Sequence, residues 1–200
     1  MTVMSIARGL RSAAPAHRFA SATLPADQGL ADAFAEAAAA PAREAGTFRP
    51  RAGAGGKTFR VDAFAGVLAR KTAAFTKELA DITLADIALA DITLDMDAEG
   101  RVTAAGGHPG KAAVERLFAG NPDFANRYRE VAGGHAFLAH CRVAARFQIE
   151  LEDSRTEEER KAILRRYDSM FSQIDGAGGR MSWSGGRLAS AAMEMTAGLL

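Results

Sequence analysis

The sequence has a single cysteine, almost no net charge and no long apolar run. The lone Cys141 excludes an intrachain disulfide and any metal site built from several thiolates, which favours a reducing compartment such as the cytoplasm. The 25 Lys and Arg residues nearly balance 24 Asp and Glu, leaving a formal net charge of +1. The chain therefore has no overall field that would draw it onto nucleic acid or an anionic membrane. Because no stretch approaches the roughly 18 apolar residues of a membrane-spanning helix, we expect no membrane partner either.

The first quarter of the chain is also poor in large apolar residues. Residues 1–56 are rich in Ala, Gly, Pro and Arg, as in the runs AAAAPAREAG and RPRAGAGG. Such a segment cannot bury enough area to offset the entropy lost on ordering it. We therefore predict a disordered or weakly ordered arm over 1–56, with one exception that the sequence allows, a short helix between Gly29 and Ala40.

The start of this arm has a composition seen in targeting segments. Its first acidic residue is Asp27, and Arg8, Arg11 and Arg18 lie before it among Ser and Ala. This pattern resembles an organelle transit peptide. The alternative, which we favour, is a mobile tail in an Ala- and Arg-rich chain of the kind that GC-rich bacterial genomes encode.

From residue 57 onward the sequence predicts one compact, mainly helical α+β domain over 57–200, with four or five helices and one or two small β-hairpins. Apolar residues that recur at intervals of three, four and seven predict the helices. Their apolar faces comprise Val61, Phe64, Leu68, Phe75 and Leu79; Val114, Leu117 and Phe118; Phe124, Tyr128 and Val131; and Ile163, Tyr167, Phe171 and Ile174.

Capping residues and glycines mark the expected helix boundaries. The Asn-Pro pair at 121–122 fits an N-cap followed by the first helical residue. The segments 154–157 and 156–159 each fit a capping box. The Gly-Gly pair at 133–134 predicts that the helix beginning at 122 breaks or kinks there.

The most unusual feature is a five-residue repeat, LADIT-LADIA-LADIT, over residues 79–93. In the register A-D-I-T-L it resembles the pentapeptide-repeat family, whose units wind into a square right-handed β-helix with four units per coil. Three units cannot complete one coil, so we do not carry that fold over. The alternation of Ala90, Ile92, Leu94 and Met96 with polar residues predicts an amphipathic strand instead. We expect the earlier copies to extend the preceding helix.

Two hairpins are predicted, one after this repeat and one near the C-terminus. The turn D-A-E-G at 97–100 allows residues 101–104 to return antiparallel to the strand before it. Residues 181–184 alternate between apolar and polar types, and the Gly pair at 185–186 can turn the chain back. The tail over 189–200 predicts a weak helix.

The sharpest chemical motif is the turn over residues 95–100, DMDAEG, which resembles the first half of an EF-hand loop. Carboxylates at alternate positions around a turn can converge on a hard cation. Asp95, Asp97 and Glu99 are therefore the candidate calcium ligands. Position twelve of the loop is Gly106 instead of the bidentate Glu. The alternative is a polar hairpin turn whose acidic side chains face water.

The imidazoles and the thiol show no catalytic spacing. His135 and His140 are five residues apart, about 140° around a helix, so they cannot chelate one ion as an i, i+4 pair does. Cys141 lies in an apolar stretch without a neighbouring base, which predicts a buried structural thiol. The sequence also lacks the phosphate-binding and nucleophile-elbow glycine motifs. We therefore expect no cofactor.

These observations predict a non-enzymatic protein–protein interaction or adaptor domain, whose partner is an unidentified protein or a second copy of the chain. Residues 80–99 contain six acids and no base, and we expect this acidic strand at a sheet edge, where another chain can pair with it or cover it. One alternative is a calcium-responsive module that uses the 95–100 turn. The other is an enzyme, which a cleft holding His135, His140, Asp168 or Glu130 together would favour.

Overall fold

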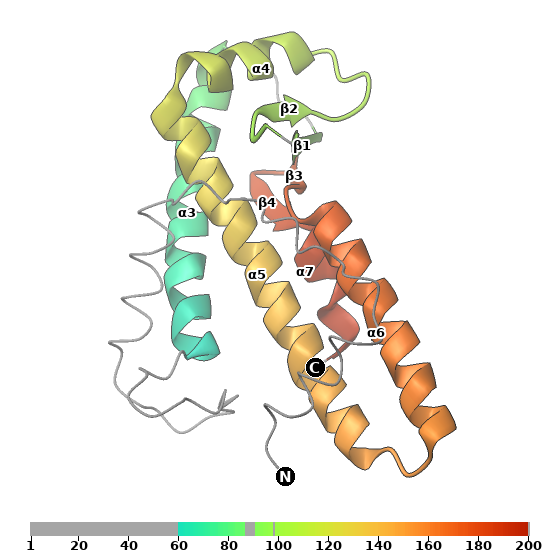
Figure 1. Cartoon of the computed structure of the whole chain (residues 1–200). Helices are drawn as coiled ribbons and strands as arrows, with labels where there is room; N and C mark the ends of the chain where they lie inside the picture. The colour runs from blue at the N-terminus through green and yellow to red at the C-terminus, as the bar shows by residue number, and fades with distance from the viewer. Residues whose placement is uncertain (1–59, 87–90, 98, 200) are drawn as a thin grey trace.

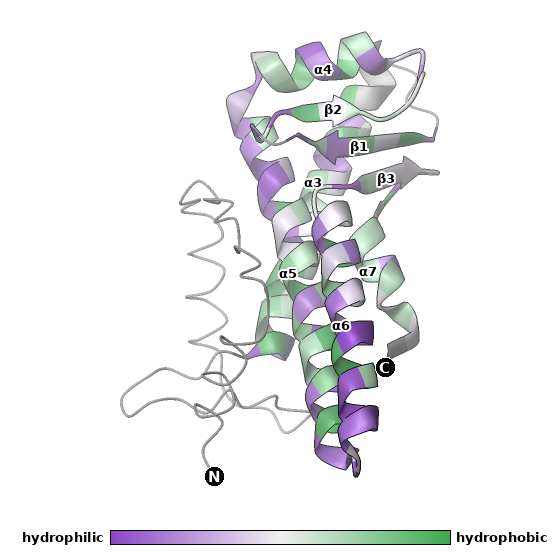
Figure 2. Ribbon diagram, turned by 45° about the vertical axis from the view of Figure 1, so that its right-hand side comes forward, coloured by the Kyte–Doolittle hydropathy of each residue, from purple (hydrophilic) through white to green (hydrophobic). Residues whose placement is uncertain are grey.

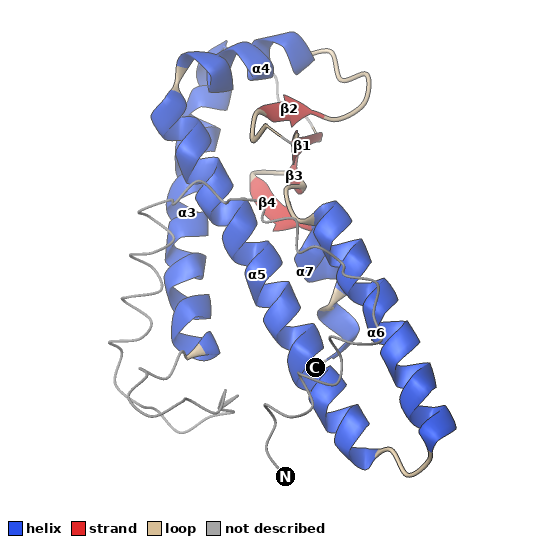
Figure 3. Cartoon of the chain, viewed as in Figure 1, coloured by secondary structure: helices blue, strands red, loops and turns tan. Residues whose placement is uncertain are grey.

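The computed structural model describes residues 60–86, 91–97 and 99–199, and the predictions for the arm over 1–56 lie outside these ranges. The described elements are α3 (Val61–Asp86), β1 (Ile92–Met96), β2 (Val102–Ala104), α4 (Lys111–Gly120), α5 (Pro122–Asp153), α6 (Glu157–Ala177), β3 (Met181–Ser184), β4 (Arg187–Ser190), α7 (Ala191–Met195) and the 3-10 helix η1 (Ala197–Leu199). Helices dominate, and the strands form one short sheet (Figure 3). The mainly helical α+β class is thus confirmed.

The long helix α5 is the axis of the molecule (Figure 1). α3 packs along its first half, α6 returns antiparallel along its second half, and α4 crosses above the sheet at one end. Hydrophilic residues cover much of the outer side of α6, as Figure 2 shows. Within the described ranges, no helix combines the length and the apolar character that crossing a membrane requires.

An aromatic cluster joins α3, α4 and α5 and packs against the buried side chains of the sheet. Phe75, Phe118, Phe124 and Tyr128 are each at most 3% exposed, and their ring centroids lie 4.8 to 6.0 Å apart. The hydroxyl of Tyr128 donates a hydrogen bond of 2.6 Å to the carbonyl oxygen of Gly179, which leads from α6 into β3. One buried side chain therefore fixes the start of the second hairpin against α3, α4 and α5.

The two predicted hairpins form, and they join into one antiparallel sheet of order β2-β1-β3-β4. In β1, Leu94 lies opposite Ala104 of β2 on one side and Met181 of β3 on the other. The acidic strand is therefore central, so the expectation that it lies at a sheet edge is wrong. The reason is its buried face, since Ile92 and Leu94 are each 1% exposed and lie in the core.

The repeated pentapeptide adopts two different structures. Its first copy, residues 79–83, continues α3, whereas the end of the third copy begins β1 at Ile92. The extension of the first helix and the amphipathic strand are both confirmed in the described residues. Tertiary packing therefore decides the conformation of this five-residue unit, and the described copies do not wind into a β-helix.

The Gly-Gly pair at 133–134 does not break α5, which runs as one helix from Pro122 to Asp153. A Cβ atom on Gly134 would lie 2.6 Å from Cδ1 of Leu68 on α3. Gly134 therefore allows α3 and α5 to pack closely. A break is wrong because packing against α3 supports the helix through a position of low intrinsic propensity, whereas the kink stays a prediction.

The predicted caps are present at the starts of α5 and α6. Oδ1 of Asn121 accepts a hydrogen bond of 3.1 Å from the N–H of Phe124. Thr156 and Glu159 form the reciprocal capping box, with bonds of 3.1 and 3.0 Å. The backbone N–H groups of Arg155 and Thr156 hold the pKa of Glu159 below its usual value.

The connection from α6 to β3 offers a test of this packing. A Cβ atom on Gly179 would lie 2.7 Å from Cβ and 3.2 Å from the backbone nitrogen of Met96 on β1. We expect Gly179→Ala to lower the free energy of unfolding by about 1–3 kcal/mol, because the backbone of β1 cannot move aside without strain.

Urea unfolding of the full chain measures this change. Gly176→Ala is the matched control, since no atom lies within 4 Å of a Cβ placed there. This control should retain its stability or gain up to about 1 kcal/mol from the better helix former. Equal stability of the two variants would show that Gly179 is not a site of close approach.

Candidate functional site

The three predicted calcium ligands lie in ion pairs with arginines. Oδ2 of Asp97 accepts from Nε of Arg101 at 2.7 Å, and its Oδ1 accepts the backbone N–H groups of Glu99 and Arg101. The backbone N–H of Arg101 is the main reason that the pKa of Asp97 lies below its usual value. Glu99 also pairs with Arg101, whereas Asp95 pairs with Arg180 at 3.0 Å.

These contacts form a polar hairpin turn, which was the alternative to the calcium loop. Gly100 supplies the left-handed conformation of the turn, with a φ of +76°. Among the described residues, no group of three or more His, Cys, Asp or Glu side chains is placed to hold a metal ion. The calcium module stays a prediction, and the contacts of Asp95, Asp97 and Glu99 do not support it.

The imidazoles and the thiol of α5 face different surroundings. His135 packs toward α3, with Nε2 3.0 Å from the hydroxyl of Thr72. His140 faces α6, where its Nε2 lies 2.9 Å from Oδ1 of Asp175. Cys141 is half-buried instead of fully buried as predicted, and burial raises its pKa to about 11. A thiol nucleophile needs a lowered pKa, so this site does not favour covalent catalysis.

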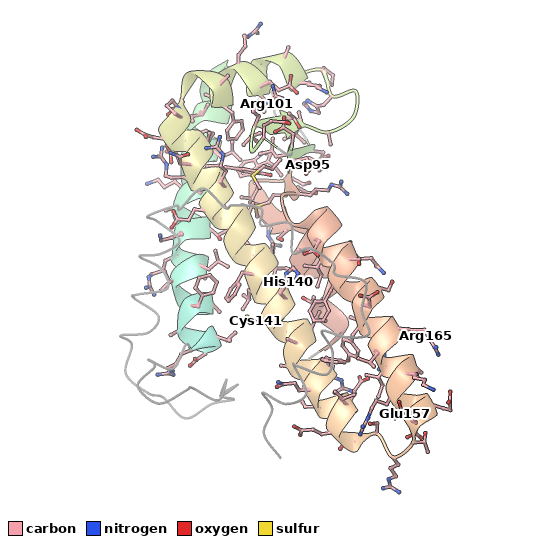
Figure 4. The ribbon with its side chains drawn as sticks, viewed as in Figure 1. Asp95, Arg101, His140, Cys141, Glu157 and Arg165 are labelled. Carbon is pink, nitrogen blue, oxygen red and sulfur yellow. The ribbon has the colours of Figure 1, made fainter. Side chains whose placement is uncertain are left out.

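A cavity of about 390 Å³ lies where the β1–β2 turn, α4 and the start of α5 meet. It is lined by Asp97, Arg101, Val102, Thr103, Glu115, Phe118, Ala119, Pro122, Ala125 and Arg129. Phe118 also belongs to the aromatic cluster, so one wall of the cavity is the edge of the rigid core. Figure 4 labels Arg101 at this end of the molecule, whereas His140 and Cys141 lie midway along α5. The cavity is thus separate from the imidazoles and the thiol.

The charged groups of the cavity are held in place by their neighbours. Asp97 is bound to Arg101, and Glu115 lies 3.8 Å from Lys111 one helical turn earlier. Arg129 donates from Nε to the carbonyl oxygen of Gly100 at 2.6 Å and from Nη1 to Oδ1 of Asn126 at 2.5 Å. Within the described part of the chain, no carboxylate lies within ion-pair distance of Arg129.

Sequence reasoning did not find this cavity, because it depends on how the β1–β2 hairpin, α4 and α5 pack on one another, which no local pattern shows. The segment Arg127-Tyr128-Arg129 gives no local signal that its two arginines differ. Arg127 pairs with Glu78 of α3, whereas Arg129 reaches the hairpin turn. Only the docking of that turn against α5 distinguishes them.

The environment of His135 makes stability depend on pH. Its Nδ1 is buried and has no hydrogen-bond partner within the described parts of the chain, and burial, aided by the charge of Arg142, lowers its pKa to about 4. The unfolded chain therefore binds this proton at higher pH than the folded chain. The stabilisation is complete above about pH 6.5 and is lost as the pH falls toward 4.

Between about pH 7.5 and pH 5, we expect the native chain to lose about 2 kcal/mol more stability than His135→Gln, which cannot titrate. Urea unfolding at both pH values measures the difference. Gln148→Ala is the control and should follow the native chain, since Gln148 is an exposed residue of the same helix without a titratable side chain. An identical pH dependence for the native chain and His135→Gln would contradict the assignment.

Calcium offers a further test. Because Asp95, Asp97 and Glu99 are each bound to an arginine, we expect about 1 mM calcium to leave the melting temperature unchanged. Differential scanning fluorimetry measures this, with Asp97→Asn as the matched variant. A rise in melting temperature that this variant lacks would establish the calcium site.

Comparison with known proteins finds no matching family model, no similar curated protein and no similar solved structure. No activity can therefore be transferred from a relative. The function has to be inferred from the cavity and from the arrangement of the titratable groups.

Proposed function

We propose that the protein is a non-enzymatic interaction domain in which the cavity between β2, α4 and α5 receives part of a protein partner. The observation that carries this proposal is the position of the cavity at the edge of the aromatic cluster. Phe118 lines the cavity and is 3% exposed, and its ring centroid lies 4.9 Å from that of Phe124. This wall of the cavity is therefore already formed without a ligand. Preformed apolar hollows of this kind accept the anchor side chains of protein partners.

The chemistry of the lining favours binding over catalysis. Both of its carboxylates, Asp97 and Glu115, have cationic partners, and its other charged groups are arginines, which stay protonated. A general base needs to accept a proton at working pH, and neither a carboxylate held in an ion pair nor a protonated arginine is suited to that role. His140 and Cys141, which could do such chemistry, lie elsewhere on α5 (Figure 4).

The mode of binding differs from strand addition at the acidic strand. β1 pairs with β2 over Leu94–Met96 and with β3 over Ile92–Leu94, so it is a central strand and not an open edge for strand addition. The proposed partner therefore contacts side chains around the cavity. We place this interaction in the cytoplasm, which the single free thiol at Cys141 supports.

Selection from a displayed peptide library against the full chain tests the proposal. We expect recurring peptides that bind with a Kd of about 1–100 µM by calorimetry, since one cavity of this size offers few anchor positions. Ala119→Trp, which places a large ring in the cavity lining, should weaken binding at least about tenfold.

Ala162→Trp is the matched control, because Ala162 is exposed on α6 and does not line the cavity. This variant should bind the selected peptides as the native chain does. The proposal is overturned when no peptide is enriched above the Ala119→Trp background. Equal binding of the peptides by both tryptophan variants would also overturn it.

A further inference from the structure

We propose that the cavity recognises a single carboxylate group attached to an apolar body, and that Arg129 is its anchor. This inference rests on the proposed function, since it names the chemical group by which a partner enters the cavity. It is carried by the contacts of one half-buried guanidinium, by the other charges of the lining and by the apolar wall opposite them.

The guanidinium of Arg129 is held in one orientation by neutral groups. Its Nε and Nη1 donate to the carbonyl oxygen of Gly100 and to the side-chain oxygen of Asn126. An arginine has five N–H donors, so three remain, including both on Nη2, and these have no acceptor in the described residues. The planar group is thus oriented in advance, with donors left for a ligand.

Arg129 differs in this from the other arginine of the cavity and from its near neighbour on α5. Arg101 and Arg127 pair with Asp97 and Glu78. The charge of Arg129 has no such partner in residues 60–86, 91–97 and 99–199, although the residue is half-buried. A carboxylate matches the fork of donors on a guanidinium, and a fixed guanidinium loses little entropy on binding it.

The remaining charges favour one negative charge over two. Asp97 and Glu115 also line the cavity, and each pairs with a cationic side chain other than Arg129. A monoanion neutralises Arg129 at close range. A phosphate dianion would bring a second negative charge toward Glu115, which repels it. The preferred ligand is therefore a monocarboxylate.

The cavity is larger than a carboxylate group needs. Its volume of about 390 Å³ is bounded by Val102, Phe118, Ala119, Pro122 and Ala125. Val102, Phe118 and Ala125 are at most 5% exposed and form the base of the cavity, whereas Ala119 and Pro122 are exposed. An apolar ligand group therefore gains mainly by covering these last two residues and displacing water from them. A ring or a branched alkyl chain next to the carboxylate fits this wall, as in the carboxyl-terminal residue of an apolar peptide.

Titrations of the full chain with small probes test the inference, followed by nuclear magnetic resonance of the backbone amides. We expect phenylacetate to bind with a Kd of about 1 mM and to shift the amides of residues 100–103 and 115–119. Phenylacetamide, its neutral analogue, should bind at least about tenfold more weakly, and phenyl phosphate should also bind more weakly than phenylacetate.

Arg129→Met keeps the length of the side chain and removes its donors, so phenylacetate binding should fall at least about tenfold. Arg127→Met is the matched control on the same helix, since Arg127 lies outside the cavity lining, and it should retain the native affinity. If Arg129→Met does not fold, Arg129→Lys replaces it in the test. It keeps the charge without the fork, and we expect a loss of about three- to tenfold.

Equal affinity for phenylacetate and phenylacetamide, or native affinity in Arg129→Met, would overturn the carboxylate site. Stronger binding of phenyl phosphate would overturn the preference for a monocarboxylate. Selected peptides that bind in the cavity without any carboxylate would also refute this inference while leaving the proposed function intact. Phenylacetate binding that depends on Arg129, without any selected peptide, would support the carboxylate site and refute the proposed function alone.

Discussion

The burial of Tyr128 is the interaction on which the rest of the structure depends. Its ring packs with Phe75 of α3 and Phe118 of α4, and its hydroxyl bonds to the carbonyl oxygen of Gly179. A tyrosine in an apolar core needs a partner for its hydroxyl, and that requirement sets where the chain leaves α6. The same side chain thereby positions the second hairpin beside the first.

The cavity is a consequence of this arrangement. α4 crosses the end of the molecule and presents Phe118 to the core, while the β1–β2 turn bends toward α5 (Figure 1). The turn is polar because Asp97 organises it, and its carbonyl group at Gly100 orients Arg129. An apolar wall and an oriented arginine thus line the same cavity. This combination can bind a ligand without any change in the protonation of its side chains.

The candidate site illustrates how far residue types and spacing can be trusted. The acidic turn has the alternate carboxylates of a cation-binding loop. Their charges are compensated by Arg101, which follows the turn, and by Arg180, which precedes β3. Charges that look isolated along the sequence are paired in space. The reverse holds for Arg129, which stands among charged neighbours in the sequence but has no carboxylate partner among the residues that the structure describes.

The sequence alone determined the helices, their caps at Asn121 and Thr156, and both hairpins, because spacing, capping and turn formation act over a few neighbouring residues. It also indicated that one repeated pentapeptide would end a helix and begin a strand. Only the tertiary structure decided that the hairpins share one sheet with β1 at its centre, that α5 continues through Gly134, and that a cavity forms beside Arg129. These features arise from contacts between distant segments, whose energies depend on shape and burial that no local pattern encodes.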